Sequence, residues 1–182
     1  MFEVTVPMSA LADRLRATLR DVPDFPRPGV VFKDITPVLK DPALFADVTA
    51  AMAAPWVGKG ITHVLAIESR GFLFGAPVAQ HLGAALVPVR KPGKLPHTRL
   101  TEHYTLEYGE DAVEVHADAF DAKSLVLIVD DVLATGGTAA ATRRLAHRLG
   151  AGVAGISAVM DLSFLPWRKA LAGTPVETLL TL

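Results

Sequence analysis

Two acidic residues beside a pair of glycines form the part of this sequence best suited to chemistry. In VLIVDDVLATGGT, residues 126–138, an apolar run leads to Asp130 and Asp131 and then to a glycine-rich turn. Glycines let the backbone approach a ligand closely, and the amides at the start of a helix attract an anion such as a phosphate. Carboxylates suit the two vicinal hydroxyls of a sugar, and their charge favours a cationic sugar carbon. The segment predicts a phosphosugar site whose phosphate contacts come from Ala134, Thr135, Gly136, Gly137 and Thr138.

Other interpretations of this segment fit less well. It contains neither GxxxxGKS/T nor GxGxxG, so neither ATP hydrolysis nor a dinucleotide site is indicated. A helix-capping turn preceded by two solvated aspartates is the alternative that a glycine pair alone would favour. The order strand, acid pair, TGG and helix favours phosphosugar binding instead.

The segment belongs to a series of apolar runs that alternate with helical patterns, which predicts a doubly wound α/β fold. The expected strands are continuously apolar, which indicates a mostly parallel central sheet flanked by helices. In such a fold the acid pair and the glycine turn stand at the carboxyl end of a strand, where ligands bind. The expected strands are residues 63–67, 84–89, 124–129 and 152–160, and the helices between them are residues 71–83 and 138–150.

The boundaries of the helices follow from capping residues. Ser9 is a candidate N-cap, so a first helix is expected over residues 9–20. Asp41 and Pro42 supply the cap and the first turn of a second helix, which runs to about Trp56. The two later helices are expected to end at left-handed glycines, Gly83 and Gly150.

Residues 97–118 interrupt this alternation. Two period-two segments, YTLEY (104–108) and AVEVH (112–116), are joined by Gly109-Glu110-Asp111 and predict a β-hairpin on a long polar connection. Connections of this kind in compact domains are more often lids or binding loops than spacers. We therefore expect a flexible hairpin lid over residues 95–118.

Length and composition limit the class of protein. With 182 residues, 51% of them hydrophobic and 20% charged, the chain is expected to fold as a single domain over residues 1–182. A net charge of −1 gives no reason to expect nucleic-acid binding, and no stretch approaches the roughly 20 apolar residues that span a bilayer. The absence of cysteine excludes disulfides and fits a cytoplasmic location. The six histidines show no paired metal-ligand spacing, so no protein-bound metal is expected.

Several segments share their order and spacing with one enzyme family. VLIVDDVLATGGT resembles the sugar-diphosphate motif of the type I phosphoribosyltransferases, and DFPRPGVVFKDITPVLKDP, ESRGFLFGAPVAQHLG, VRKPGKLP and YTLEYG resemble signature segments of the adenine phosphoribosyltransferases. The resemblance covers roughly residues 20–165. It implies a purine salvage reaction in which adenine and 5-phosphoribosyl-1-pyrophosphate give AMP and pyrophosphate. It also implies Mg²⁺ carried by the substrate diphosphate, a homodimer, and a small base-binding hood to which residues 1–35 contribute.

The resemblance assigns the diphosphate to the turn after the HVLAIES strand. Ser69 and Arg70 lie there, at a strand-to-helix junction that can present amides to an anion. A nucleophilic Ser69 is disfavoured because Ile67 occupies the first glycine position of GxSxG. Lys91 and Lys94 are either solvated lysines that discourage sheet pairing or further contacts to the anion. With a diphosphate expected nearby, anion contact is favoured.

For the base, the resemblance implies backbone contacts at Val31 and Lys33, with the Phe32 ring on one side of adenine and Leu162 on the other. An extended backbone supplies the acceptors and donors that the edge of adenine requires. From the residues alone, Phe32 would be assigned to the core. This chain departs from many relatives by carrying Lys33 in place of an arginine and Trp167 in place of a glycine.

The reaction needs negative charge and a base. Departure of pyrophosphate leaves positive charge on the sugar ring, which Asp130 and Asp131 are expected to stabilise. The attacking ring nitrogen of adenine must also lose a proton. Enzymes of the fold that act on 6-oxopurines typically carry an aspartate where this chain has Ala134. Glu107 in YTLEYG is therefore the candidate general base, and the alternative is a solvent-facing hairpin glutamate.

Two other functions are considered from the sequence. Regulators with this fold bind the same sugar diphosphate as an effector, but they need a basic face or an added nucleic-acid-binding segment. Enzymes acting on hypoxanthine or xanthine are the alternative within the same class, and Ala134 together with FPRPGVVFKDITP argues for adenine. Phe72, Leu73 and Phe74 are candidates for an apolar dimer interface, although the sequence itself does not decide the oligomeric state.

Overall fold

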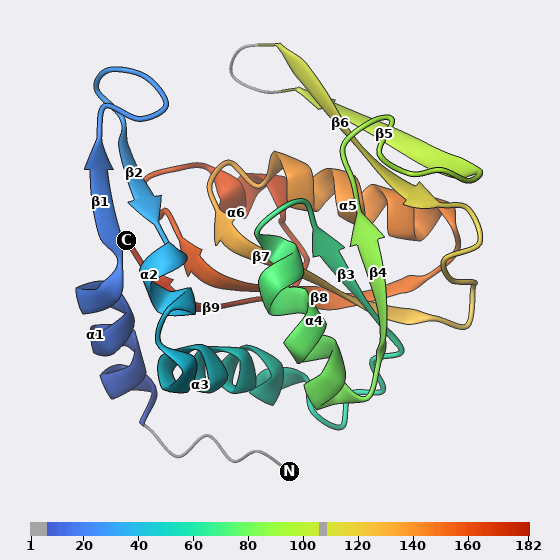
Figure 1. Ribbon diagram of the computed structural model, residues 1–182. Helices are drawn as coiled ribbons and strands as arrows, with labels where there is room; N and C mark the ends of the chain where they lie inside the picture. The colour runs from blue at the N-terminus through green and yellow to red at the C-terminus, as the bar shows by residue number, and fades with distance from the viewer. Residues whose placement is uncertain (1–6, 106–108) are drawn as a thin grey trace.

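Five parallel strands form the central sheet of the computed structural model, which describes residues 7–105 and 109–182. Helices cover both faces of the sheet (Figure 1), so the expected α/β fold class is confirmed. The order of the strands in the sheet is β4 (Ala85–Val89), β3 (His63–Ile67), β7 (Leu125–Leu133), β8 (Gly152–Asp161) and β9 (Val176–Thr181). The edge strand β9 was not among the strands expected from the sequence.

The order of these strands creates a switch point between β3 and β7. From β3 the chain passes through α4 (Gly71–Leu82) to β4 on one side, and it later returns to β7 on the other side. Ligands of open α/β sheets bind in the crevice outside the carboxyl ends of strands at such a point. The turns after β3 and β7 are therefore the segments from which a ligand site is expected.

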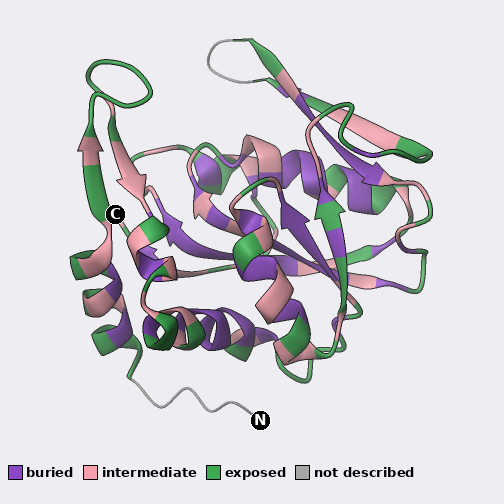
Figure 2. Cartoon of the chain, viewed as in Figure 1, coloured by how far each residue is buried: buried purple, intermediate pink, exposed green. Residues whose placement is uncertain are grey.

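Alternate residues of β7 face two different halves of the core. Val126 and Ile128 pack in the cluster that contains α5 (Gly137–Arg148), whereas Leu127 and Val129 pack in the cluster beneath the other helices. All four are fully buried, as the purple central strands of Figure 2 show. The continuous apolar run is thus explained by burial of the strand on both faces.

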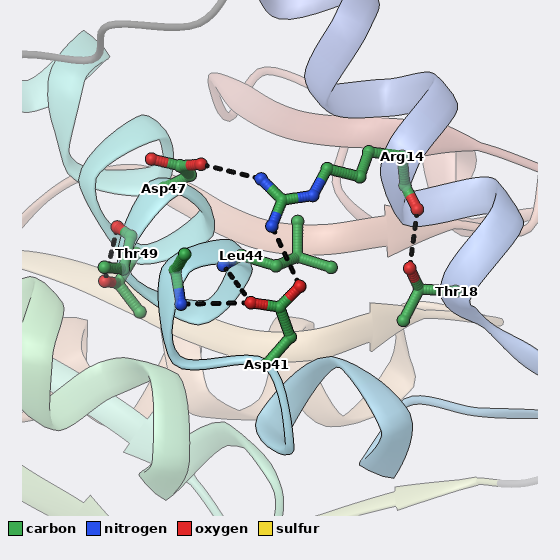
Figure 3. A network of polar contacts seen from close by, with 8 residues as sticks. Arg14, Thr18, Asp41, Leu44, Asp47 and Thr49 are labelled. Carbon is green, nitrogen blue, oxygen red and sulfur yellow. Dashed lines mark hydrogen bonds and ion pairs between the residues drawn. The ribbon is translucent and has the colours of Figure 1, made fainter.

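The N-terminal helices lie on the face opposite α5. Asp41 caps α3 (Pro42–Ala53) by accepting hydrogen bonds from the amides of Ala43 and Leu44 at 3.1 and 3.0 Å. Arg14 of α1 (Met8–Thr18) binds the same carboxylate at 2.8 Å and Asp47 at 3.1 Å (Figure 3). The cap that starts α3 therefore also attaches α1 to it.

Two helix boundaries differ from expectation. α1 begins at Met8 with Pro7 at its N-cap, so Ser9 lies inside the helix and was wrongly taken as the cap. The helix stops at Thr18 because Leu19 is already extended, with ψ 143°, and leads into a strand. The second helix ends at Ala53 and continues to Trp56 as a 3₁₀ turn, η1 (Ala54–Trp56).

A small antiparallel sheet stands apart from the central one. It pairs β1 (Arg20–Pro23) with β2 (Val31–Asp34), and α2 (Thr36–Leu39) connects it to the main body. Asp24 accepts a hydrogen bond from the amide of Gly29 at 2.8 Å and closes the loop between the strands. We refer to residues 20–34 as the hood; its two strands were not foreseen.

The expected hairpin is present but longer than its sequence pattern suggests. Its strands are β5 (Arg99–Thr105) and β6 (Glu110–His116), so β5 starts five residues earlier than expected and two expected turn residues belong to β6. The first part of β5 shows no alternation of apolar and polar residues, because its polar residues are held by partners. Glu102, for example, binds Arg144 and Arg148 of α5 at 2.6 and 2.9 Å. Glu107 lies outside the described residues.

The two glycines expected to end helices do so. Gly83 caps α4 with φ +63°, and Gly150 follows the end of α5 with φ +88°. The final helix is the short α6 (Trp167–Ala170), which packs against α5. Among the described residues, none of the helices is long and apolar enough to cross a membrane.

Candidate functional site

The turns that follow β3, β4 and β7 meet around one pocket of about 320 Å³. The pocket lies at the switch point, where a ligand site was expected from the strand order. It brings together most of the site residues expected from the sequence, namely Ser69, Arg70, Lys91, Asp130, Asp131, Ala134, Thr135, Gly136, Gly137 and Thr138.

The glycine turn forms one wall of this pocket. Gly136 is the N-cap of α5 and has φ +79°, a conformation that favours glycine. A Cβ atom at this position would stand 3.2 Å from Trp167 and from the Cβ of Ala170, so α6 lies directly behind the turn. The first amides of an α-helix have no partner within the helix. The start of α5 therefore offers donors at the pocket wall, as phosphate binding requires.

The acid pair lies within β7 rather than after the strand, because β7 continues to Leu133. Asp131 is buried and binds the Nε of Arg70, while its own amide donates to Asp130 at 2.9 Å. Burial of the carboxyl group, together with the charge of Asp131, raises the pKa of Asp130 well above its ordinary value. The pair therefore presents two different carboxyl groups, one in an ion pair and one that binds its proton tightly.

Lys91 supplies positive charge at the pocket wall. Its ammonium binds the carboxylate of Asp111 and the hydroxyl of Tyr104, the latter at 2.9 Å. Burial lowers the pKa of Lys91, but the bonds to Asp111 and Tyr104 outweigh this effect and raise it. The lysine is therefore a cation held in one place.

Glu68 is a pocket residue that sequence reasoning missed. Its carboxylate accepts from the Nε of Arg90 at 2.9 Å and from the amide of Lys91 at 2.8 Å, which fixes the turn after β4. Burial raises the pKa of Glu68, but these bonds and the charges of Arg90 and Lys94 lower it overall. Lys94 itself is exposed and does not line the pocket. A glutamate followed by SRG at a strand end is the signal that could have identified Glu68.

The residues expected to hold the base lie beside the pocket rather than in its wall. Phe32 is edge-on to Phe25 at 5.2 Å, and the guanidinium of Arg70 lies 5.3 Å from its ring centre. Val31 is 53% exposed, and Lys33 donates to Asp21 at 2.6 Å. Arg70 thus connects the hood with the acid pair.

Leu162 stands at the same edge of the sheet. Its amide donates to the carbonyl of Leu133 at 3.0 Å, and its side chain is partly exposed.

Of the three apolar residues proposed for a dimer interface, Leu73 is exposed and Phe72 is partly buried. Phe74 is fully buried in the core, so its assignment to an interface was wrong.

No group of three or more histidine, aspartate or glutamate side chains within residues 7–105 and 109–182 is arranged to hold a metal ion. The pocket itself combines cationic, anionic and amide groups. They combine donors for a phosphate at Gly136–Thr138, acceptors for hydroxyls at the acid pair, and a fixed ammonium at Lys91.

A parallel α/β protein with this pocket at its switch point belongs to the class that binds phosphorylated sugars or nucleotides. A model of the phosphoribosyl transferase domain matches residues 37–163. An adenine phosphoribosyltransferase of Myxococcus xanthus is 55% identical, with 96% of this chain and 98% of that protein covered. The chain belongs to the adenine phosphoribosyltransferase family.

Solved structures agree with this assignment. Adenine phosphoribosyltransferase from Rhodothermus marinus superposes with a TM-score of 0.91 and 50% identity, covering 96% of this chain and 99% of that one. The enzyme from Saccharomyces cerevisiae, solved with an imino-altritol bisphosphate and adenine, gives a TM-score of 0.86 at 41% identity and covers 94% and 99%. The similarity extends over almost the whole chain.

Proposed function

We propose that this protein transfers the 5-phosphoribosyl group from 5-phosphoribosyl-1-pyrophosphate to adenine, giving AMP and pyrophosphate in purine salvage. One observation carries the proposal: the glycine turn, the acid pair and two basic residues line a single pocket at the switch point of the sheet. The relatives named above carry this activity in their names.

The pocket has a group for each part of the sugar diphosphate. The amides of Ala134–Thr138 bind the 5′-phosphate, and Asp130 and Asp131 bind the ribose hydroxyls. Arg70 and Lys91 contact the diphosphate, supported by the backbone at Ser69. Lys94 adds positive charge from outside the pocket wall.

Adenine binds between the hood and the pocket. Backbone groups of Val31 and Lys33 contact its polar edge, while Phe32 and Leu162 cover its two faces. The 5.3 Å approach of Arg70 to Phe32 supports this placement, because it brings the hood beside the diphosphate site. The base is thereby held next to the sugar carbon that it attacks.

In the reaction, a ring nitrogen of adenine bonds to C1 of the ribose as the bond from C1 to pyrophosphate breaks. Positive charge develops on the sugar ring, and the carboxyl groups of the acid pair lie where they stabilise it. Glu107 takes the proton that adenine loses. The hairpin that carries Glu107 acts as a lid, and its residues Tyr104 and Asp111 already contact Lys91.

Magnesium bound to the diphosphate neutralises the charge of the leaving group. The pocket suits such an ion because magnesium prefers carboxylate and phosphate oxygens and keeps several waters. The carboxylates of the acid pair lie on the wall of the same pocket as Arg70 and Lys91. Arg70, Lys91 and the acid pair would orient the substrate that carries the ion.

We further propose a homodimer and a cytoplasmic location. Leu73 of α4 and Leu86 of β4 are each 45% exposed. Helix α4 packs against β4, which is an edge strand of the central sheet (Figure 1). Burying such side chains against a second copy would remove apolar surface from water. The proposed substrates are small metabolites that a cytoplasmic enzyme encounters.

Product analysis tests the proposed function. The protein is incubated with 5-phosphoribosyl-1-pyrophosphate, magnesium and one of adenine, hypoxanthine or xanthine, and the nucleotide formed is identified by chromatography. We expect AMP and pyrophosphate in equal amounts from adenine. Preferential formation of a 6-oxopurine nucleotide would assign the protein to the alternative class, and no nucleotide from any base would contradict the proposal.

A further inference from the structure

Tyr104 connects the hairpin with both ends of the pocket. It belongs to β5, is 7% exposed, and its hydroxyl has three partners. The hydroxyl accepts from the ammonium of Lys91 at 2.9 Å and from the hydroxyl of Thr138 at 3.0 Å, and it donates to the carboxylate of Asp111 at 3.0 Å. A phenol has one hydrogen and two lone pairs, so its bonding capacity is fully used.

The ring of Tyr104 also contacts the phosphate turn. A Cβ atom added at Gly137 would stand 3.1 Å from Cδ2 of this ring, so the ring lies against the backbone of the turn. The ammonium of Lys91 is 5.5 Å from the ring centre. A phenylalanine would provide the same packing, whereas the bonds to Lys91, Thr138 and Asp111 require the hydroxyl.

We propose that Tyr104 is a positioning residue, which holds Thr138 of the phosphate turn and Lys91 of the turn after β4 in fixed relation to each other and to the hairpin. The inference rests on the proposed function. Thr138 and Lys91 lie at the two places assigned to the 5′-phosphate and the diphosphate of one substrate. A shared hydrogen-bond partner therefore sets the spacing between two anion sites.

The donors and acceptors fit this role. Thr138 has a single hydroxyl hydrogen, which it gives to Tyr104, and this fixes the orientation of its side chain. Lys91 has three hydrogens, of which Tyr104 and Asp111 take two, and the third is left for a substrate anion. Without the tyrosine hydroxyl, Lys91 is held by Asp111 alone and Thr138 loses its acceptor.

The test replaces the hydroxyl and keeps the ring. In Tyr104→Phe, we expect the KM for 5-phosphoribosyl-1-pyrophosphate to rise about tenfold, the size expected for a lost hydrogen bond to a charged group. The KM for adenine should stay unchanged, since the partners of the Tyr104 hydroxyl, Lys91, Thr138 and Asp111, do not belong to the hood. Thr101→Val is the matched control, because it removes another β5 hydroxyl whose partner, Glu114 at 3.0 Å, does not line the pocket, whereas Lys91 and Thr138 do.

A double-mutant cycle separates positioning from general stability. If Tyr104 acts through Thr138, the effects of Tyr104→Phe and Thr138→Val on the KM for 5-phosphoribosyl-1-pyrophosphate are not additive in the double variant. Additive effects, or a lower melting temperature of Tyr104→Phe with both KM values unchanged, would overturn the inference. A wild-type protein that forms no AMP would instead overturn the proposed function.

Discussion

The phosphate turn and the hood border the same site, but the fold supports them differently. The turn follows a strand whose residues 126–129 are fully buried, and Trp167 packs directly behind it. The hood is a pair of four-residue strands joined by a loop, and Phe25 of the loop and Val31 of β2 are 51% and 53% exposed. Under the proposed function, the sugar phosphate would be recognised by a part of the core, whereas the base would be recognised by a small surface unit.

Arg70 is the residue through which the two regions meet. Its guanidinium binds Asp131 in the pocket and lies over the ring of Phe32 in the hood. Substitutions in the pocket should therefore affect recognition of the sugar diphosphate, and substitutions in the hood should affect recognition of adenine. The expected effects below run from the largest to the smallest.

Removing both carboxyl groups of the acid pair from the pocket should have the largest effect. In the double variant Asp130→Asn, Asp131→Asn, we expect calorimetry to detect no binding of 5-phosphoribosyl-1-pyrophosphate, because the hydroxyl acceptors and the partner of Arg70 are lost together. The control with the same change in charge is Asp13→Asn, Asp118→Asn, at two exposed positions. If the pocket variant still binds 5-phosphoribosyl-1-pyrophosphate, the acid pair does not hold the sugar.

A substitution in the hairpin should change turnover without changing the binding of either substrate. Glu107→Gln should lower turnover about 100-fold, the contribution typical of a general base, with little change in either KM. Glu110→Gln, at an exposed position at the start of β6, is the control on the same hairpin. Unchanged turnover in Glu107→Gln would exclude this residue from the mechanism.

A change in the hood should affect the base alone. Phe32→Ala is expected to raise the KM for adenine about tenfold, as for loss of one stacked aromatic side chain. The KM for 5-phosphoribosyl-1-pyrophosphate should not change, and Phe32→Tyr, which keeps the aromatic face, should restore the KM for adenine. An equal rise in both KM values would show that the hood and the pocket are not separate recognition units.

The turn itself should be sensitive to one added methyl group. Gly136 and Gly58 have similar positive φ angles, +79° and +75°, but a Cβ atom meets Trp167 at 3.2 Å in the first case and no atom within 4 Å in the second. Alanine at either position should cost about 1–3 kcal/mol of backbone strain. Urea denaturation should show the greater loss for Gly136→Ala, and equal losses would contradict the close support of the turn by α6.

The smallest effect is an increase in stability. Because the pKa of Asp130 is raised in the folded state, its ionised form opposes folding once the pH exceeds the ordinary value of 3.8. Asp130→Asn should therefore raise the melting temperature at neutral pH, and the gain should shrink as the pH falls toward 3.8. The control is Asp13→Asn, which makes the same substitution at an exposed position. A gain of the same size at all pH values would contradict the raised pKa.

The pocket was more predictable from the sequence than the elements around it. The buried run of β7 with its acid pair and glycines predicted where the pocket lies, since strand ends of a parallel sheet converge on one edge. The hood strands were missed because RDVP and VFKD are too short to show a period. β9 was missed because it is an edge strand, in which Thr178 and Thr181 donate to Asp161 at 2.8 Å.

Tyr104 and Glu68 show a different limit of sequence reasoning. Both belong to segments that the sequence singled out, but their roles depend on partners 13 to 34 positions away in the chain, such as Lys91 and Thr138. Such pairings become visible only when the turns of several strands are brought together. Spacing along the chain identified the segments, and the fold identified their partners.

The central claim is that the amides near Gly136 and Gly137 bind the 5′-phosphate while Asp130 and Asp131 hold the ribose hydroxyls. A crystal structure of the protein grown with AMP tests it most directly. We expect phosphate oxygens about 2.9 Å from the amides of the turn and both ribose hydroxyls on the acid pair. AMP bound elsewhere, with this turn empty, would contradict the account.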